Sequence, residues 1–194
     1  NLFFQATPLK KTGHLKRIIH VSTFEDKSKN ISGIIKSVKK LTLIRSDFKL
    51  ILIGDGMDFK LLKNLALELQ LDESQIEFSG LLEKEELVEQ FMLADFMVIN
   101  SHYENMPVVI NEAFACGLPV LSTDVGGISE HLSPVHGRLM PRNNETAFIE
   151  NFIWMLDHCR DFNSVAIRDY AQTHFSYAGV GFTLDKIYQS ASLK

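Results

Sequence analysis

The chain alternates short apolar runs with stretches whose apolar residues recur at helical spacing. Short apolar runs bounded by turn residues are typical of buried strands, and the wider spacing is typical of amphipathic helices. A strand is predicted at 17–22, a helix with apolar residues from 31 to 41, and a second strand at 49–54. A strand, a helix and a strand in this order form a βαβ unit, which places both strands parallel in one sheet.

The same alternation continues to about residue 123 and then becomes helical. The next expected elements are helices at 58–70 and 83–93, a helix that contains Glu112 and ends near Gly117, strands at 75–78, 95–100 and 118–123, and final helices at 144–159, 163–174 and 177–192. This order predicts an α/β fold with a doubly wound parallel sheet, helices on both faces and extra C-terminal helices.

Two carboxylates bracket the junction between the strand at 95–100 and the next helix. Glu104 falls in the connecting loop, and Glu112 falls about a turn and a half into a helix whose first turn contains Pro107. Because open α/β sheets bind ligands at the carboxyl ends of their strands, both acids are expected to face one cleft. Two acids in one cleft are compatible with acid and base catalysis of hydrolysis or with contacts to a polar ligand.

Three glycine-containing loops are expected at the same edge of the sheet. The first, 54–56, lacks the third glycine of a dinucleotide fingerprint and the lysine of a P-loop, so a tight turn is the default interpretation. The second, 79–82, offers backbone groups to a flat base edge. The third, 124–130, contains Gly126 and Gly127 before an expected short helix, a pattern that can form an anion-binding nest.

Basic residues that could hold a phosphate are few. Lys27 and Lys29 follow the first predicted strand, in a loop just before Asn30. A loop lysine is usually solvated, but Lys29 falls at the edge where Glu104 and Glu112 are expected. An ammonium in that position can pair with a phosphate.

Composition excludes several classes of protein. With 194 residues, 45% hydrophobic and 23% charged, the chain can bury a single core, and its net charge of −4 argues against a nucleic-acid partner. Cys116 and Cys159 have no metal-ligand spacing, which favours buried thiols in a reducing cytosol. No apolar run approaches the ~18 residues of a membrane span, and the first residues lack the order of a signal peptide.

A series of short motifs covers most of the chain in a specific order. They are Val21-Ser22-Thr23 with Lys29-Asn30, then 52–56, Phe78-Ser79-Gly80, Ala94-Asp95, 101–112, 113–120, and 123–127 with Glu130. Together they resemble the GT-B glycosyltransferases of the large retaining group (group 1, family 4-like), which transfer sugar from nucleotide-sugar donors.

The resemblance implies a domain organisation. Residues 15–194 would form a Rossmann-like, nucleotide-sugar binding domain, the C-terminal half of a two-domain GT-B enzyme. Residues 1–14 would be the remnant of the interdomain linker and not part of the core. In the family the last helix packs back toward the amino-terminal half, and the aromatic residues near it are expected to pack between helices. These aromatic residues are Phe175, Tyr177, Phe182 and Tyr188.

The resemblance also implies roles for individual residues. Glu112 would accept hydrogen bonds from the ribose hydroxyls. Two catalytic residues are implied: Glu104 would contact the donor sugar or support charge at its anomeric carbon, and Lys29 would neutralise the leaving diphosphate. Further donor contacts are implied for Asn105, Met106, Pro107, Val108 and Val109 at the helix start, for Gly54, and for Gly80 and Leu81 at the base edge.

One departure from the family concerns the phosphate site. Thr23 stands where the family often has an arginine. Either Lys27 or a residue of the other half of the enzyme could replace the missing arginine, and both alternatives are open at this point.

The implied activity is retaining transfer of a hexose from a nucleoside diphosphate, in polysaccharide biosynthesis, to a glycan or lipid-linked acceptor bound through the missing N-terminal domain. No metal or cofactor is implied, the fragment alone should turn over little, and the location is cytoplasmic or the inner face of the membrane.

Two alternatives stay open. One is a nucleotide-sugar epimerase or phosphorylase of the same architecture. The other is a non-catalytic α/β binding module, although 21–23 supply none of the aspartates that a receiver domain needs.

Overall fold

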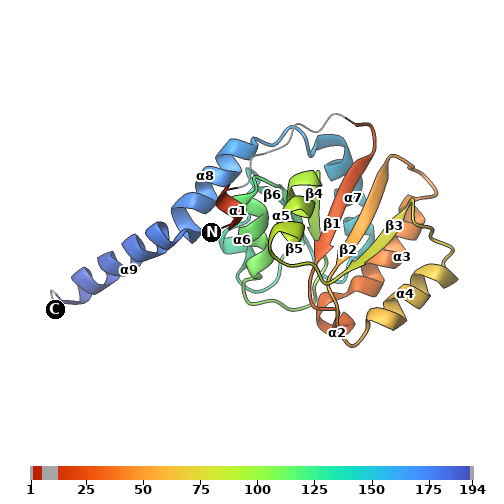
Figure 1. Ribbon diagram of the computed structural model, residues 1–194, viewed down its shortest axis with the longest axis horizontal. Helices are drawn as coiled ribbons and strands as arrows, with labels where there is room; N and C mark the ends of the chain where they lie inside the picture. Colours follow the sequence, from red (N-terminus) through yellow and green to blue (C-terminus); the bar gives the residue numbers. More distant parts are fainter. Residues whose placement is uncertain (1, 6–12, 193–194) are drawn as a thin grey trace.

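One six-stranded parallel sheet forms the centre of the protein in the computed structural model, which describes residues 2–5 and 13–192 (Figure 1). The sheet order is β3-β2-β1-β4-β5-β6, and every neighbouring pair is parallel. The chain therefore builds outward from β1 to β3, returns to the middle, and builds outward again from β4. The strands are β1 Lys16–Val21, β2 Phe48–Ile53, β3 Ile76–Gly80, β4 Phe96–Ile99, β5 Val120–Thr123 and β6 Gly137–Met140.

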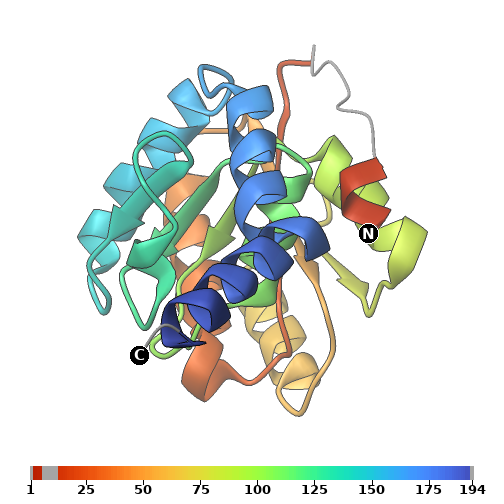
Figure 2. The same ribbon diagram turned by 90° about the vertical axis from the view of Figure 1, so that its left-hand side faces the viewer.

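Helices cover both faces of the sheet (Figures 1 and 2). One face carries α3 Ile31–Leu41, α4 Phe59–Glu68 and α7 Glu145–His158, and the other carries α5 Lys84–Leu93, α6 Val108–Ala115 and α8 Ser164–Phe175. This arrangement confirms the predicted doubly wound α/β fold. The remaining helices are α1 Leu2–Gln5, α2 Asp26–Lys29, α9 Tyr177–Ser192 and the 3₁₀ turn η1 Ile128–Glu130.

Alternate residues of each central strand belong to two separate hydrophobic clusters. In β4, Phe96 and Val98 pack under α3 and α7, whereas Met97 and Ile99 pack under α5 and α6. A strand buried on both faces needs apolar residues at every position, which is why its sequence reads as a continuous apolar run. This alternation decides which side of the sheet each residue after the strand faces.

The sequence did not predict β6, because everything after residue 123 was assigned to helices. The strand is four residues long, contains Gly137 and Arg138, and lies at the edge of the sheet beside β5. A Cβ at Gly137 would lie 1.8 Å from the carbonyl oxygen of Val120, so the glycine allows the two strands to approach. The pairing comes from β5 rather than from an apolar pattern in β6 itself.

The amino-terminal segment also differs from its prediction. Leu2, Phe3 and Phe4 are partly buried against the hydrophobic cluster that contains α5 and α6. The ring of Phe3 meets that of Phe91 edge to face, with 5.6 Å between centroids. The expectation that 1–14 lies outside the core is therefore wrong for Leu2, Phe3 and Phe4, whereas Gln5 is exposed. Residues 1 and 6–12 of that linker prediction lie outside the described residues.

The last helix, α9, extends away from the sheet in Figure 1. Phe175, just before it, packs against the core as predicted, but Tyr177 is 91% exposed. Most of the expected aromatic packing is therefore absent in α9. Its exposed apolar residues are Tyr177, Val180, Phe182, Leu184, Ile187 and Tyr188. Within 2–5 and 13–192, no helix combines the length and the apolar character needed to cross a membrane.

Candidate functional site

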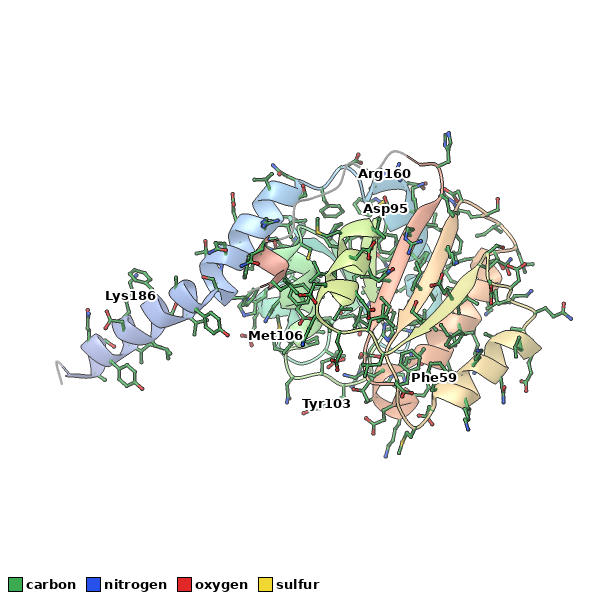
Figure 3. The ribbon with its side chains drawn as sticks, viewed as in Figure 1. Phe59, Asp95, Tyr103, Met106, Arg160 and Lys186 are labelled. Carbon is green, nitrogen blue, oxygen red and sulfur yellow. The ribbon has the colours of Figure 1, made fainter. Side chains whose placement is uncertain are left out.

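A cavity of about 200 Å³ opens at the carboxyl edge of the sheet, beside the point where the strand order reverses between β1 and β4. We call it the switch-point cavity. Ligands of open α/β folds bind at this point. Figure 3 marks the nearby loop by Tyr103 and Met106, below the ends of the strands. The cavity is lined by His20, Val21, Ser22 and Thr23 after β1, Lys29 of α2, Ile99, Ser101 and Glu104, and Pro107, Val108 and Val109 at the start of α6.

A partly buried ion pair lies in the wall of the cavity. The ammonium of Lys29 lies 2.7 and 2.9 Å from the two carboxylate oxygens of Glu104. The hydroxyl of Ser101 donates to the same carboxylate at 2.7 Å, and the hydroxyl of Thr123 donates to the Ser101 carbonyl. Glu104 is thereby held in one position by three charged or polar contacts.

A short helix rather than a loop places Lys29. The chain after β1 forms α2, which ends at Asn30 in the left-handed conformation, with a φ of 52°. The amide of Asp26 donates to Asp58, and the Asp26 carboxylate accepts from the amide of Ser32 in α3. The predicted loop is therefore a single turn fixed at both ends, and it directs Lys29 toward Glu104.

His20 is a lining residue that the sequence did not single out. Its Nδ1 lies 2.9 Å from the carbonyl oxygen of Val98, so Nδ1 carries the hydrogen and Nε2 accepts from the hydroxyl of Ser22 at 2.8 Å. Burial lowers the pKa of His20 to about 4, which keeps the ring neutral at neutral pH. The only sequence signal was a polar residue within an apolar run.

The start of α6 presents unused backbone donors to the cavity. Pro107 is the N-cap residue and makes no side-chain cap hydrogen bond. The amides of Val108 and Val109 make no hydrogen bond to the parts of the chain that the structure describes. Unpaired amides at a helix start attract anions, and here they line the same cavity as Lys29.

Glu112 is half-buried and unpaired. Its carboxylate has no hydrogen bond or ion pair with any of the described residues, and burial raises its pKa. It lies one helical turn after Val108, on the same side of α6, but it does not line the switch-point cavity. The cleft predicted to hold both acids is thus lined by Glu104 alone, and the ribose role of Glu112 stays a prediction.

Three predicted donor contacts, Gly54, Gly80 and Leu81, do not line the cavity. Gly54 has a φ of 140°, and a Cβ there would lie 1.9 Å from the carbonyl oxygen of Ser22. Its amide donates to Gly80 at 2.8 Å, and Leu81, the next residue, is exposed. Gly54 is therefore required for the close approach of the ends of β1 and β2, and any donor contact by these residues stays a prediction.

The paired glycines support the loop that carries Glu104. A Cβ at Gly126 would lie 1.9 Å from the carbonyl oxygen of Glu104, and the amide of Gly127 donates to the carbonyl of Asn105 at 2.6 Å. The Gly127 amide is thus already used, so the predicted anion nest is wrong for that group. Asn105 and Met106 do not line the cavity.

The remaining phosphate candidates differ in position. Thr23, at the place of the family arginine, is exposed and lines the cavity. Lys27 is exposed and is not part of the lining, which gives no support to compensation by that lysine. Among 2–5 and 13–192, no group of three or more His, Cys, Asp or Glu residues is arranged to hold a metal ion.

The protein-family model described as "Glycosyl transferases group 1" matches residues 4–168. A curated relative, N-acetyl-alpha-D-glucosaminyl L-malate synthase of Bacillus anthracis, is 34% identical over 119 residues, which are 59% of this chain and 29% of that protein. The chain therefore spans less than a third of that relative's length.

Solved structures share the fold at low identity. The lipopolysaccharide outer core galactosyltransferase WaaB, in its apo form, matches with a TM-score of 0.80 at 17% identity, over 94% of this chain and 52% of that one. Anabaena Alr3699/HepE, in complex with UDP, matches with a TM-score of 0.77 at 20% identity, over 91% of this chain and 49% of that one.

Proposed function

Because this chain belongs to the group 1 glycosyltransferases, with the GT-B fold of that family, we propose that its switch-point cavity binds the diphosphate and sugar of a nucleoside-diphosphate sugar. In this proposal Glu112 binds the ribose. The UDP in the similar HepE structure supports a uridine donor as the first to test.

The proposal rests on one observation, which is that Lys29 and the start of α6 line the same cavity. The lysine ammonium and the unpaired amides of Val108 and Val109 line one cavity. A diphosphate needs positive charge and several donors at once, and these groups supply both without a metal ion. We propose on this ground that donor binding is metal-independent.

The unpaired carboxylate of Glu112 fits a diol. Its two oxygens can accept both hydroxyl protons of a ribose, and burial strengthens such bonds. Without a partner, burial of the charge is unfavourable, and the raised pKa of Glu112 is the sign of that cost. A bound ribose would supply the missing partners.

The proposed reaction is hexose transfer with retention at the anomeric carbon. The bond from that carbon to the diphosphate oxygen breaks, and its electron pair leaves with the diphosphate. The acceptor hydroxyl forms the new bond on the same face of the sugar, and its proton passes to the departing diphosphate. Lys29 and the α6 amides stabilise the charge that develops on the diphosphate, and Glu104 orients the sugar.

The proposed acceptor is a glycan or lipid-linked glycan held by a second domain. The chain covers about half of the similar structures, 52% and 49%, which supports its assignment as the donor-binding half of a two-domain enzyme. The residues near the cavity would then supply the donor side of the reaction, in the cytoplasm or at the inner face of the membrane.

Calorimetry of UDP and GDP binding in the presence of EDTA tests this proposal. We expect wild-type protein to bind one of the two nucleotides and Glu112→Ala to bind it at least about tenfold more weakly, since two hydrogen bonds to a charged group are lost. Glu68→Ala, at an exposed glutamate of α4, is the matched control and should bind as wild type. Equal affinity in Glu112→Ala would refute the ribose assignment.

A further inference from the structure

A second, polar cavity lies at the same edge of the sheet, on the side of α3 and α7. Its volume is about 320 Å³. We call it the amide cavity, because four of its lining residues are asparagines. It is lined by Asn30, Gly33, Lys36 and Ser37 at α3, Asn100 and His102 after β4, and Asn143, Asn144 and Glu145 at the start of α7.

Two of the lining side chains are buried polar groups without partners. Asn100 is 9% exposed and Ser37 is 2% exposed. Neither side chain makes a hydrogen bond to any of residues 2–5 or 13–192. Neither polar group is sealed from solvent, so each takes its hydrogen bonds from whatever fills the cavity, either water or a ligand with hydroxyl groups.

The strand alternation places the Asn100 side chain on the amide-cavity side. Phe96 and Val98 of β4 face α3 and α7, so the next residue in that series, Asn100, faces the same way. Ser37 interrupts the buried face of α3, whose other members are all apolar: Ile31, Ile34, Ile35, Val38 and Leu41. The two polar groups therefore converge on one space from the sheet and from the helix.

Further amides complete the wall. The carbonyl oxygen of the Asn144 side chain accepts from the Ala147 amide, which leaves its NH₂ group as a donor. A Cβ at Gly33 would lie 2.4 Å from the side-chain oxygen of Asn30, so the glycine within α3 gives the Asn30 side chain its place. These amides can both donate and accept hydrogen bonds.

The charges of the lining favour a neutral ligand. The buried polar members of the lining, Asn100 and Ser37, are uncharged. Its two charged members, Lys36 and Glu145, are exposed. A pyranose ring presents several hydroxyls, each both donor and acceptor, which match amide and serine side chains. We propose that the amide cavity binds one neutral pyranose unit of a saccharide. This goes beyond donor binding in the switch-point cavity and does not depend on it.

A titration followed by amide NMR spectra tests the proposal on this chain. The probes are the methyl α-D-pyranosides of glucose, mannose and galactose, each added to the millimolar range. For at least one of them we expect saturable shifts of the side-chain NH₂ signals of Asn30, Asn100 and Asn144. UDP and the pyranoside should bind at the same time, because no residue lines both cavities.

Two variants and a control complete the test. Asn100→Leu and Ser37→Val each remove one buried polar group and should weaken pyranoside binding at least about fivefold, the equivalent of one hydrogen bond. Asn64→Leu, at an exposed position of α4, should bind as wild type. If Asn100→Leu fails to fold, Ser37→Val alone decides.

The proposal is overturned if no pyranoside shifts these signals, if the shifts fall only around Thr23 and Val108, or if Ser37→Val binds as wild type. Binding of UDP and of GDP is recorded on the same samples. A chain that binds one of these nucleotides but no pyranoside contradicts this inference alone, and a chain that binds a pyranoside but neither nucleotide contradicts the proposed donor site alone.

Discussion

The side chains of Lys29 and Glu104 satisfy each other's charge at the place where a diphosphate is proposed to bind. A phosphate that approaches Lys29 must compete with a carboxylate that Ser101 also holds in position. Nucleotide affinity at this site is therefore a difference between two charge-assisted contacts rather than the full strength of one.

Replacement of Lys29 tests this competition. Lys29→Met removes the cation and leaves Glu104 facing the phosphates, so we expect UDP affinity to fall by about tenfold or more, and its salt dependence to decrease. Lys27→Met, at an exposed lysine two residues earlier, is the control. Calorimetry at low and high salt measures both quantities. A larger loss of UDP affinity in Lys27→Met than in Lys29→Met would show that Lys27, and not Lys29, binds the phosphate.

Glu112 should cost stability in the free protein. Its pKa is raised from the ordinary value of 4.5 by burial, so the folded state disfavours the ionised form. The stability that neutral Glu112 contributes is fully present below that value and is lost as pH rises through the raised pKa. Glu112→Gln cannot ionise, and we expect its melting temperature at pH 7 to exceed that of wild type by a few degrees at most, with no difference near pH 4. A Glu112→Gln variant less stable than wild type at pH 7 would contradict this.

Sequence reasoning at this scale succeeded where residues belong to ordered motifs. The meeting of Lys29 with Glu104 follows from their positions after two strands that lie side by side. His20, Ser37 and Asn100 were not predicted, since a polar residue within an apolar pattern gives no sign of its partners. Only the packing of β1, β4 and α3 shows what surrounds them.

Among the elements, the loop between β4 and α6 depends on a neighbour. Gly126 has a φ of 59° and lies so close to Glu104 that any side chain would collide with its carbonyl oxygen. The turn before η1 therefore fixes the position of the β4–α6 loop beside the switch-point cavity.

Gly126→Ala should disturb both stability and the cavity. Left-handed backbone and a collision with main-chain atoms together predict a loss of about 1–3 kcal/mol in the free energy of unfolding, and weaker UDP binding as the loop moves. Gly181→Ala is the matched control, because nothing lies within 4 Å of a Cβ there and the residue is in the exposed helix α9. Urea unfolding measures the first effect and calorimetry the second. Equal stability of the two variants would show that the loop is not supported as described.

The elements that the sequence missed have a common cause. Both α2 and β6 are four residues long. The equally short β4 was predicted from its continuous apolar run, which β6 lacks because it contains Gly137 and Arg138. Each is held by contacts from elsewhere, α2 by Asp58 and β6 by β5. Longer elements with a continuous buried face were predicted to within one or two residues at most ends, as for α3 and β2.

In the molecule as a whole, α9 stands apart from the two hydrophobic clusters. Its apolar residues are exposed, and the helix extends from α8 away from the sheet (Figure 1). Ion pairs elsewhere lie within the body of the domain, such as Arg160 with Asp95 at the edge opposite the switch-point cavity (Figure 3). The domain core therefore does not require α9.

Truncation after Ser176 tests this independence. Because α9 buries little apolar surface, we expect the truncated chain to keep the melting temperature of wild type within a few degrees and to bind UDP with unchanged affinity. Removal of the exposed apolar residues should also reduce concentration-dependent self-association, measured by light scattering after size exclusion. Loss of cooperative unfolding in the truncated chain would place α9 in the core.

The end of β4 sends neighbouring residues to opposite faces of the sheet, Asn100 to the amide cavity and Ser101 to the switch-point cavity. Two consecutive residues of the chain therefore line two different cavities. Side chains alternate along a strand, so a single-residue insertion or deletion in β4 would change the lining residues of both cavities at once. The lining of one cavity can therefore change independently of the other by substitution, but not by a shift of the strand.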